Sequence, residues 1–141
     1  MSLKDLVAQT ATVSVPSAGG PVPLVVRGLG LGAIMALMRN YGDTLESLYT
    51  KAAAGEMEAD MLGGLISEAM ARSGDLVADI IAWGCGEPDQ VDQCKLLPVG
   101  AQVELLEAIL LLTFAAEGGP KKLMETVIRA MSGFNSLDLG G

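Results

Sequence analysis

The sequence contains no histidine, and this absence excludes several kinds of active site. A Ser-His-Asp triad and a Cys-His pair both need an imidazole as the general base, and histidine is also the commonest protein ligand of transition metals. Neither nucleophilic catalysis of these types nor a histidine-based metal site is therefore available to this chain.

Basic residues and aromatic residues are also scarce. Lys and Arg number 9 against 17 Asp and Glu, so the formal net charge at pH 7 is −8, and only 4% of the residues are aromatic. A surface of this sign repels phosphate backbones, and few rings are present to stack on bases. The composition therefore predicts that the partners of this chain include no nucleic acid.

Cysteine is limited to two residues, and no long apolar run is present. Cys85 and Cys94 are too few for a disulfide framework or a zinc site, and their simplest role is that of small buried hydrophobes. No stretch reaches the ~18 consecutive apolar residues that a membrane span requires, and the first residues lack a signal-peptide pattern. We therefore expect a cytoplasmic protein with reduced thiols and no membrane partner.

Near its N-terminus the chain contains two short runs of residues that favour β-strands. Residues 10–15 and 22–27 flank a segment rich in proline and glycine, a pattern that predicts a β-hairpin over residues 10–27. Pro23 lacks an N–H donor, so its strand is expected at a sheet edge or to begin after it. Because an isolated hairpin is marginal in water, it has to pack against later parts of the chain.

From residue 29 onward the apolar residues recur with the 3.6-residue period of helices. The pattern predicts a helix that stops near Gly42, a second helix capped by Asp43 and a third over residues 57–72. The segment Ser73-Gly-Asp75 ends the third helix and starts a fourth, which is broken at Gly84. Further helices are expected over residues 89–95, 99–117 (with Pro98 as a suitable first helical residue) and 121–131.

With 141 residues, no long linker and no repeat, these elements predict a mainly α fold. We expect one compact multi-helix domain over residues 1–141, with a short N-terminal β-hairpin. The helical body would occupy residues 30–131, and residues 132–141 would form a flexible tail.

Acidic residues form two helix-spaced pairs, Asp75/Asp79 and Glu104/Glu107. Such pairs could bind a cation or act in acid–base chemistry, but a solvated helix face accounts for them more simply. The glycines of the segment 28–32 lack the spacing of a nucleotide-binding loop and favour a flexible corner between strand and helix. The residues therefore indicate no catalytic, cofactor-binding or metal site.

The long helix over residues 99–117 carries a stripe that changes character along its length. Glu104 and Glu107 begin it, and Leu111 and Phe114 continue it at helical spacing. Either the helix becomes buried all round toward its end, or that end exposes an apolar patch to another chain. Methionine, of which the chain has eight, adds adaptable side chains that suit binding surfaces as well as cores. The candidate partner-binding residues are Leu111, Phe114, Met124 and Met131.

Two segments resemble a known family. The strand end Val25-Val-Arg-Gly-Leu29, which runs into a helix, is similar to the start of tail assembly chaperones from long-tailed bacteriophages, where such a strand leads into an all-helical body. The stretch from Leu97 to Phe114, followed by an acidic and glycine-rich segment, resembles the family's C-terminal helix. Only Arg27, Gly28 and Leu29 match a recurring pattern, and that pattern is compatible with a purely structural role.

The resemblance implies a non-enzymatic role without a cofactor, in the cytoplasm of the bacterial host. Members of this family bind the tape measure protein while the tail tube polymerises around it. In many phages a longer form, made by ribosomal frameshifting, is thought to recruit the tail tube protein. Because binding at many sites along a long client favours multiple copies, we also expect a homo-oligomer.

Two other hypotheses stay open on the residues alone. A permanent structural or adaptor subunit of a phage or bacterial assembly would share the helical core and the acidity but would remain in the finished particle. An enzyme that uses carboxylates and a metal such as Mg²⁺ would need acidic side chains that converge on a concave site.

Overall fold

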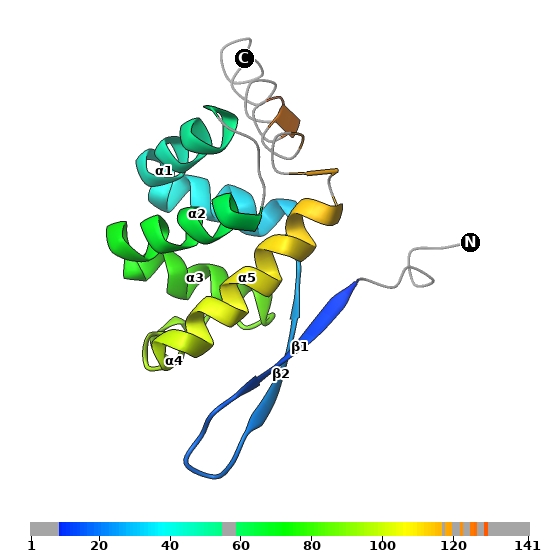
Figure 1. The fold of residues 1–141 in the computed structure, drawn as a ribbon, viewed down its shortest axis with the longest axis vertical. Coiled ribbons are helices and arrows are strands. Elements are labelled where there is room, and N and C mark those ends of the chain that lie inside the picture. Colours follow the sequence, from blue (N-terminus) through cyan, green and yellow to red (C-terminus); the bar gives the residue numbers. More distant parts are fainter. Residues whose placement is uncertain are drawn as a thin grey trace, which may run out of the picture.

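A computed structural model of the chain describes residues 9–54 and 59–116 and six later positions. Of residues 48–54, 59–63 and 65 it describes the backbone only. The six later positions are Gly118, Gly119, Lys122, Glu125, Thr126 and Arg129. Within this part of the chain, two strands precede a group of helices (Figure 1), which confirms the mainly α fold with an N-terminal hairpin.

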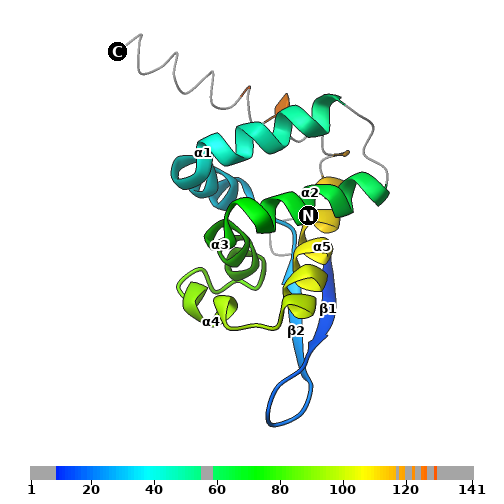
Figure 2. The ribbon, with the colours of Figure 1, turned by 60° about the vertical axis from the view of Figure 1, so that its left-hand side comes forward.

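The hairpin consists of β1 (Thr10–Val15) and β2 (Val22–Arg27), paired antiparallel with Thr12 opposite Val25. Side chains of a strand alternate between the two faces of a sheet, and here one face carries the more buried residues. Figure 2 shows the closed end of the hairpin projecting beyond the helices. The residues on the more buried face are Ala11, Val13, Val15, Leu24 and Val26.

The helices follow the predicted order closely, and most boundaries agree to within two residues. Ser73 begins one of them as predicted, because its side chain accepts a hydrogen bond of 3.1 Å from the N–H of Leu76. The described helices are α1 (Leu31–Ala54), α2 (Ala59–Arg72), α3 (Gly74–Gly84), α4 (Val91–Lys95) and α5 (Val99–Ala116).

The predictions at Gly42 and Pro98 each differ from the structure by one residue. The predicted break near Gly42 is present as a kink: within α1, two helical stretches meet at Tyr41, where φ is −134° and ψ is 32°. The break therefore lies one residue before Gly42. Pro98 lies just before α5 instead of inside it, because its carbonyl accepts the helix's first hydrogen bond, from the N–H of Gln102 at 3.0 Å.

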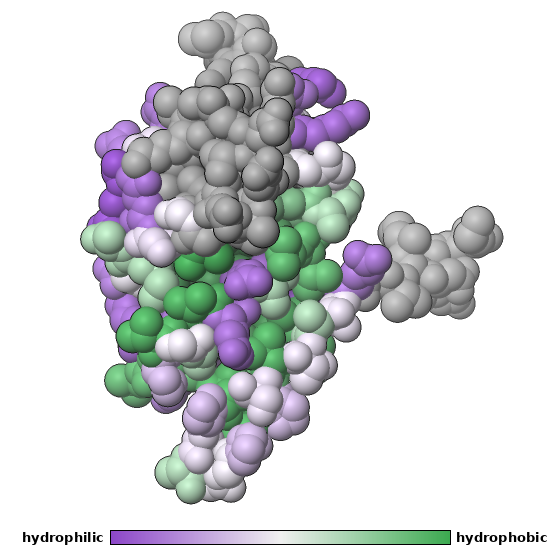
Figure 3. Space-filling view, in the orientation of Figure 1, coloured by the Kyte–Doolittle hydropathy of each residue, from purple (hydrophilic) through white to green (hydrophobic). Residues whose placement is uncertain are grey.

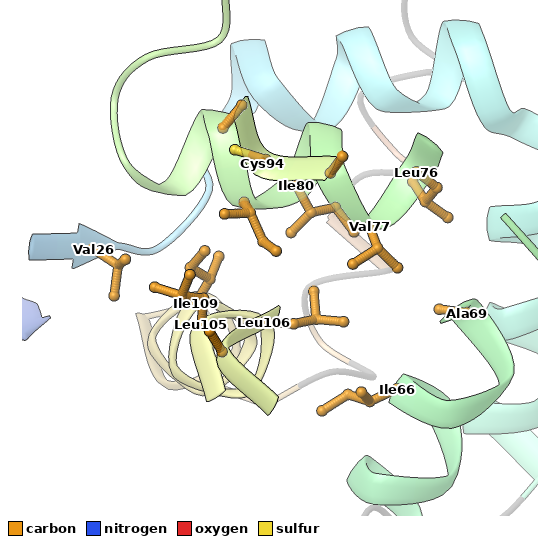
Figure 4. Packing of buried hydrophobic residues seen from close by; sticks show 14 of the residues in the cluster. Val26, Ile66, Ala69, Leu76, Val77, Ile80, Cys94, Leu105, Leu106 and Ile109 are labelled. Carbon is orange, nitrogen blue, oxygen red and sulfur yellow. The ribbon is translucent and has the colours of Figure 1, made fainter. Parts of the chain in front are cut away.

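The core is organised around α5. Ile109 and Leu105 on this helix lie beside Val26 of β2, and Leu106 faces Ile66 of α2, as Figure 4 shows. The largest fully buried side chains come from α5 and from two elements that pack against it, β2 and α3. The inward side of α5 is therefore covered by the hairpin, α2 and α3. The side chains with less than 2% exposure are Leu76, Ile81, Leu105, Leu106, Ile109, Val26 and Val77.

The hairpin is attached to α5 just beyond the end of β2. The N–H of Leu29 donates a hydrogen bond of 2.8 Å to Thr113 Oγ1, and this hydroxyl donates in turn to the carbonyl of Ile109 at 2.7 Å. Thr113 is only 2% exposed, so its hydroxyl is shielded from water. A Cβ at Gly28 would lie 3.0 Å from both Cα and N of Thr113, so a residue without a side chain is needed for this approach.

The motif Arg27-Gly28-Leu29 therefore has a structural role. Gly28 allows the close contact with α5, and Leu29 supplies the hydrogen bond to Thr113. Arg27 is exposed at the end of β2. Its guanidinium lies so close to Gly86 that a Cβ on residue 86 would be only 2.7 Å from Nη2 of Arg27. Gly86 itself has a φ of +78°, a conformation that favours glycine.

We expect Gly28→Ala to lower the free energy of unfolding by about 1–3 kcal/mol, because the added methyl group has to move β2 and α5 apart. Gly30→Ala is the matched control, since a Cβ at that position meets nothing within 4 Å and the change should be close to neutral. Urea unfolding followed by circular dichroism compares the two variants. Equal stabilities would contradict the close packing at Gly28.

Candidate protein-binding surface

The outward side of α5 is only partly polar. Glu104 and Glu107 are exposed, as expected for a solvated stripe, but Leu111 on the same side is 50% exposed. Phe114 is half-buried and packs against the core. The two predicted alternatives thus both apply in part: the helix buries Phe114 partially and leaves Leu111 open to solvent.

Leu111 has apolar neighbours on its own helix. Val103, Leu110 and Phe114 are half-buried and pack against the core cluster, and helical spacing places them on the flank next to Leu111. We call these four residues the α5 surface. Figure 3, which views the side of the molecule where α5 lies in front, shows hydrophobic residues on both sides of a few strongly hydrophilic ones.

A second exposed apolar pair lies where α4 leads into α5. Leu96 is 78% exposed and Val99 is 68% exposed, the two largest values among the exposed large hydrophobic residues. Sequence patterns did not identify them, since this stretch was interpreted only as a helix boundary. Both residues lie next to the helix boundary at Pro98, Leu96 in the turn before it and Val99 at the first position of α5, where a periodic pattern does not guarantee an apolar residue a buried face.

The apolar composition of α5 is also typical of a membrane-spanning helix, and the packing of α5 bears on that interpretation. By length and composition, residues 99–116 are apolar enough to cross a membrane. The same helix places Leu105, Leu106 and Ile109 fully inside the core, in contact with the hairpin, α2 and α3. A helix at the centre of a folded core passes the same compositional test, so the test alone does not assign a membrane role.

The acidic pairs do not converge on a common site in the described part of the chain. Asp75 forms an ion pair with Lys95, with 3.0 Å between Oδ1 and Nζ, and Asp79 accepts a short hydrogen bond from the hydroxyl of Tyr41. Glu104 and Glu107 are exposed on α5. Among the described residues, no three His, Cys, Asp or Glu side chains are close enough together to hold a metal ion.

The cysteines lie at the edge of the core near α4. Cys94 is 8% exposed and belongs to the hydrophobic cluster, and Cys85 is half-buried against it. Burial, with smaller contributions from nearby groups such as Cys85, raises the pKa of the Cys94 thiol to about 11. A thiol that stays protonated at neutral pH behaves as an apolar group, in agreement with the packing role expected from the sequence.

Two of the four candidate binding residues, Met124 and Met131, lie outside the described residues. Their predicted roles stay predictions. Three other methionines are half-buried in the helical part of the fold, at Met35, Met38 and Met70. Both predicted binding residues that the structure describes, Leu111 and Phe114, therefore lie on the α5 surface.

The model of the pre-tape measure protein family matches residues 1–139, nearly the whole chain. The chain belongs to this family. Membership relates it to the tape measure protein and to phage tail assembly, as the resemblance at Arg27-Gly28-Leu29 implied. No curated protein and no solved structure matches the chain significantly.

The different burial of Leu111 and Phe114 predicts different effects of the same substitution on this family member. Phe114→Asp should lower the free energy of unfolding by about 2–3 kcal/mol, because it removes packing and places a charge against the core. Leu111→Asp should change it by less than about 1 kcal/mol. Thermal unfolding measures both, and a large loss for Leu111→Asp would show that Leu111 is covered in solution.

The bond between Tyr41 and Asp79 makes stability depend on alkaline pH. Burial and the hydrogen bond to Asp79 raise the pKa of Tyr41 from 10.0 to about 12. The folded state thus holds this proton more tightly, so the stabilisation is complete below pH 10 and is lost between about pH 10 and pH 12. Tyr41→Phe should cost about 1 kcal/mol at pH 7, and its difference from wild type should shrink across that interval. Urea unfolding at several pH values tests this, and a constant difference would contradict it.

Proposed function

We propose that this chain is a non-enzymatic tail assembly chaperone that binds the tape measure protein in the bacterial host cytoplasm and keeps it soluble while the tail tube forms. The observation that carries the proposal is Leu111, which is 50% exposed on a helix whose opposite side lies in the core. A side chain of this kind, flanked by half-buried apolar neighbours, loses contact with water when a partner covers it. Family membership supports the tape measure protein as that partner.

The α5 surface favours a client with a particular pattern. Its four residues follow helical spacing, which suits the apolar stripe of another helix. Glu104 and Glu107 lie on the same side of α5 and provide acidic groups next to the apolar ones. The best client segment would therefore combine apolar residues at helical spacing with Lys or Arg beside them.

The charge of the chain supports the same role. A protein that exposes apolar surface risks self-association through that surface, and a net charge of −8 opposes it by repulsion between copies. On the strength of the family resemblance, we also propose that a frameshifted longer form, if the gene encodes one, contacts the tail tube protein.

Co-expression with the tape measure protein tests the proposal directly. The wild-type chain should raise the soluble fraction of the tape measure protein and co-purify with it, and Leu111→Asp should lose most of this effect while keeping a normal thermal melt. Gln93→Asp is the matched control, because it adds the same charge at an exposed helical position on α4. A tape measure protein whose solubility does not respond to the wild-type chain would contradict the chaperone role.

A permanent structural subunit predicts a different location at the end of assembly. Mass spectrometry of purified virions separates the two functions, because a chaperone leaves before the particle is complete. Detection of this chain in mature tails at a fixed ratio to the tail tube protein would favour the structural subunit.

A further inference from the structure

The two edges of the hairpin differ in their surroundings. Beyond β2, the guanidinium of Arg27 lies against Gly86 in the segment between α3 and α4. In the described part of the chain, β1 pairs with β2 and with no third strand. Both views of the ribbon show β1 on the outer side of the hairpin, away from α3 and α4 (Figures 1 and 2). Among the described residues, the outer edge of β1 is therefore the open one.

The composition of β1 leaves this edge unprotected. Proteins usually block an edge strand with a charged residue, a proline or a bulge, because unpaired N–H and C=O groups attract other strands. β1 has the sequence TATVSV, which contains no charge and no proline, and its register with β2 has no bulge. β2, by contrast, carries both Pro23 and Arg27.

We propose that the open edge of β1 pairs with the same edge of a second copy of this chain, so that two hairpins form one four-stranded antiparallel sheet. A two-fold axis that passes through the Thr12 pair puts the more buried faces of the two hairpins on the same side of the joined sheet. Thr10 then lies opposite Ser14, Ala11 opposite Val13, and Thr12 opposite its own copy. Hydroxyl side chains face one another on one side of the sheet and apolar side chains on the other, both favourable cross-strand pairs.

The burial of β1 fits this register. On the face toward α5, Val15 is 4% exposed, whereas Ala11 and Val13 are only half-buried. These two are the apolar residues that the Thr12-centred pairing brings together, so a second copy would cover the part of the face that one α5 leaves open. Two strands alone are only marginally stable, whereas a sheet of four strands with a covered apolar face is stable.

Electrostatics is compatible with a second copy as the partner at this edge. Two chains with a net charge of −8 repel each other across most contacts, but β1 holds none of the 17 acidic residues. Backbone hydrogen bonds along an uncharged edge therefore allow two copies to meet with little local repulsion. This inference concerns the hairpin and does not depend on the proposed client or on the α5 surface.

Sedimentation velocity of the purified full chain over a range of concentrations tests the pairing. The wild type should shift with concentration toward twice the 14.5 kDa mass of one chain. Thr12→Lys should weaken association at least tenfold, since it places two lysine side chains directly opposite each other across the axis, with their Cβ atoms about 5 Å apart, and like charges at opposite positions repel. Val25→Lys is the matched control: Val25 is exposed and lies opposite Thr12 on the other strand, so its two copies would be about 14 Å apart and screened by salt.

Three results of this experiment would overturn the proposal. They are a wild type that stays monomeric, a folded Thr12→Lys that dimerises as the wild type does, and a folded Val25→Lys that is as monomeric as Thr12→Lys. If Thr12→Lys fails to fold, hydrogen exchange on the wild type decides instead. Amide exchange in β1 should slow as concentration rises while exchange in α3 stays constant, and a β1 rate independent of concentration would count against the pairing.

Discussion

The contact between Gly28 and Thr113 is the constraint on which the rest of the fold depends. It joins the exit of the hairpin to the helix at the centre of the core, through two backbones in close approach and one buried hydroxyl. Once the hairpin is fixed there, Val26 reaches the core beside Ile109, and the same exit sets where α1 begins. A motif that carries no chemistry of its own therefore determines how sheet and helices are placed.

Local patterns in the sequence were sufficient to predict the hairpin and the order of the helices. Alternation over residues 10–27 and helical periodicity after residue 29 are properties of short segments, and Ser73 marks a helix start by its own side chain. Glycine at position 42 likewise indicated the break in α1, which the structure places at Tyr41. The hydrogen bond from Tyr41 to Asp79 was not predictable in this way, because its partner is 38 residues away.

The candidate site was predictable in part for a similar reason. The stripe from Glu104 to Phe114 followed from spacing alone, but the burial of each residue depends on which neighbouring element covers it. Both flanks of α5 are apolar, so no strong asymmetry distinguishes the core side from the outward side. Only the placement of α2, α3 and the hairpin separates the exposed Leu111 from the half-buried Phe114.

The hydrogen bond from Leu29 to Thr113 also has a consequence for the order of events during synthesis. Its two residues are separated by 84 positions, so the hairpin leaves the ribosome long before the helix that supports it. The uncharged edge of β1 is then present on a nascent chain that has not yet made its long-range contacts, which is the stage at which strand edges associate wrongly. Translation through α5 thus ends a vulnerable interval, and its duration is set by the position of Thr113 in the chain.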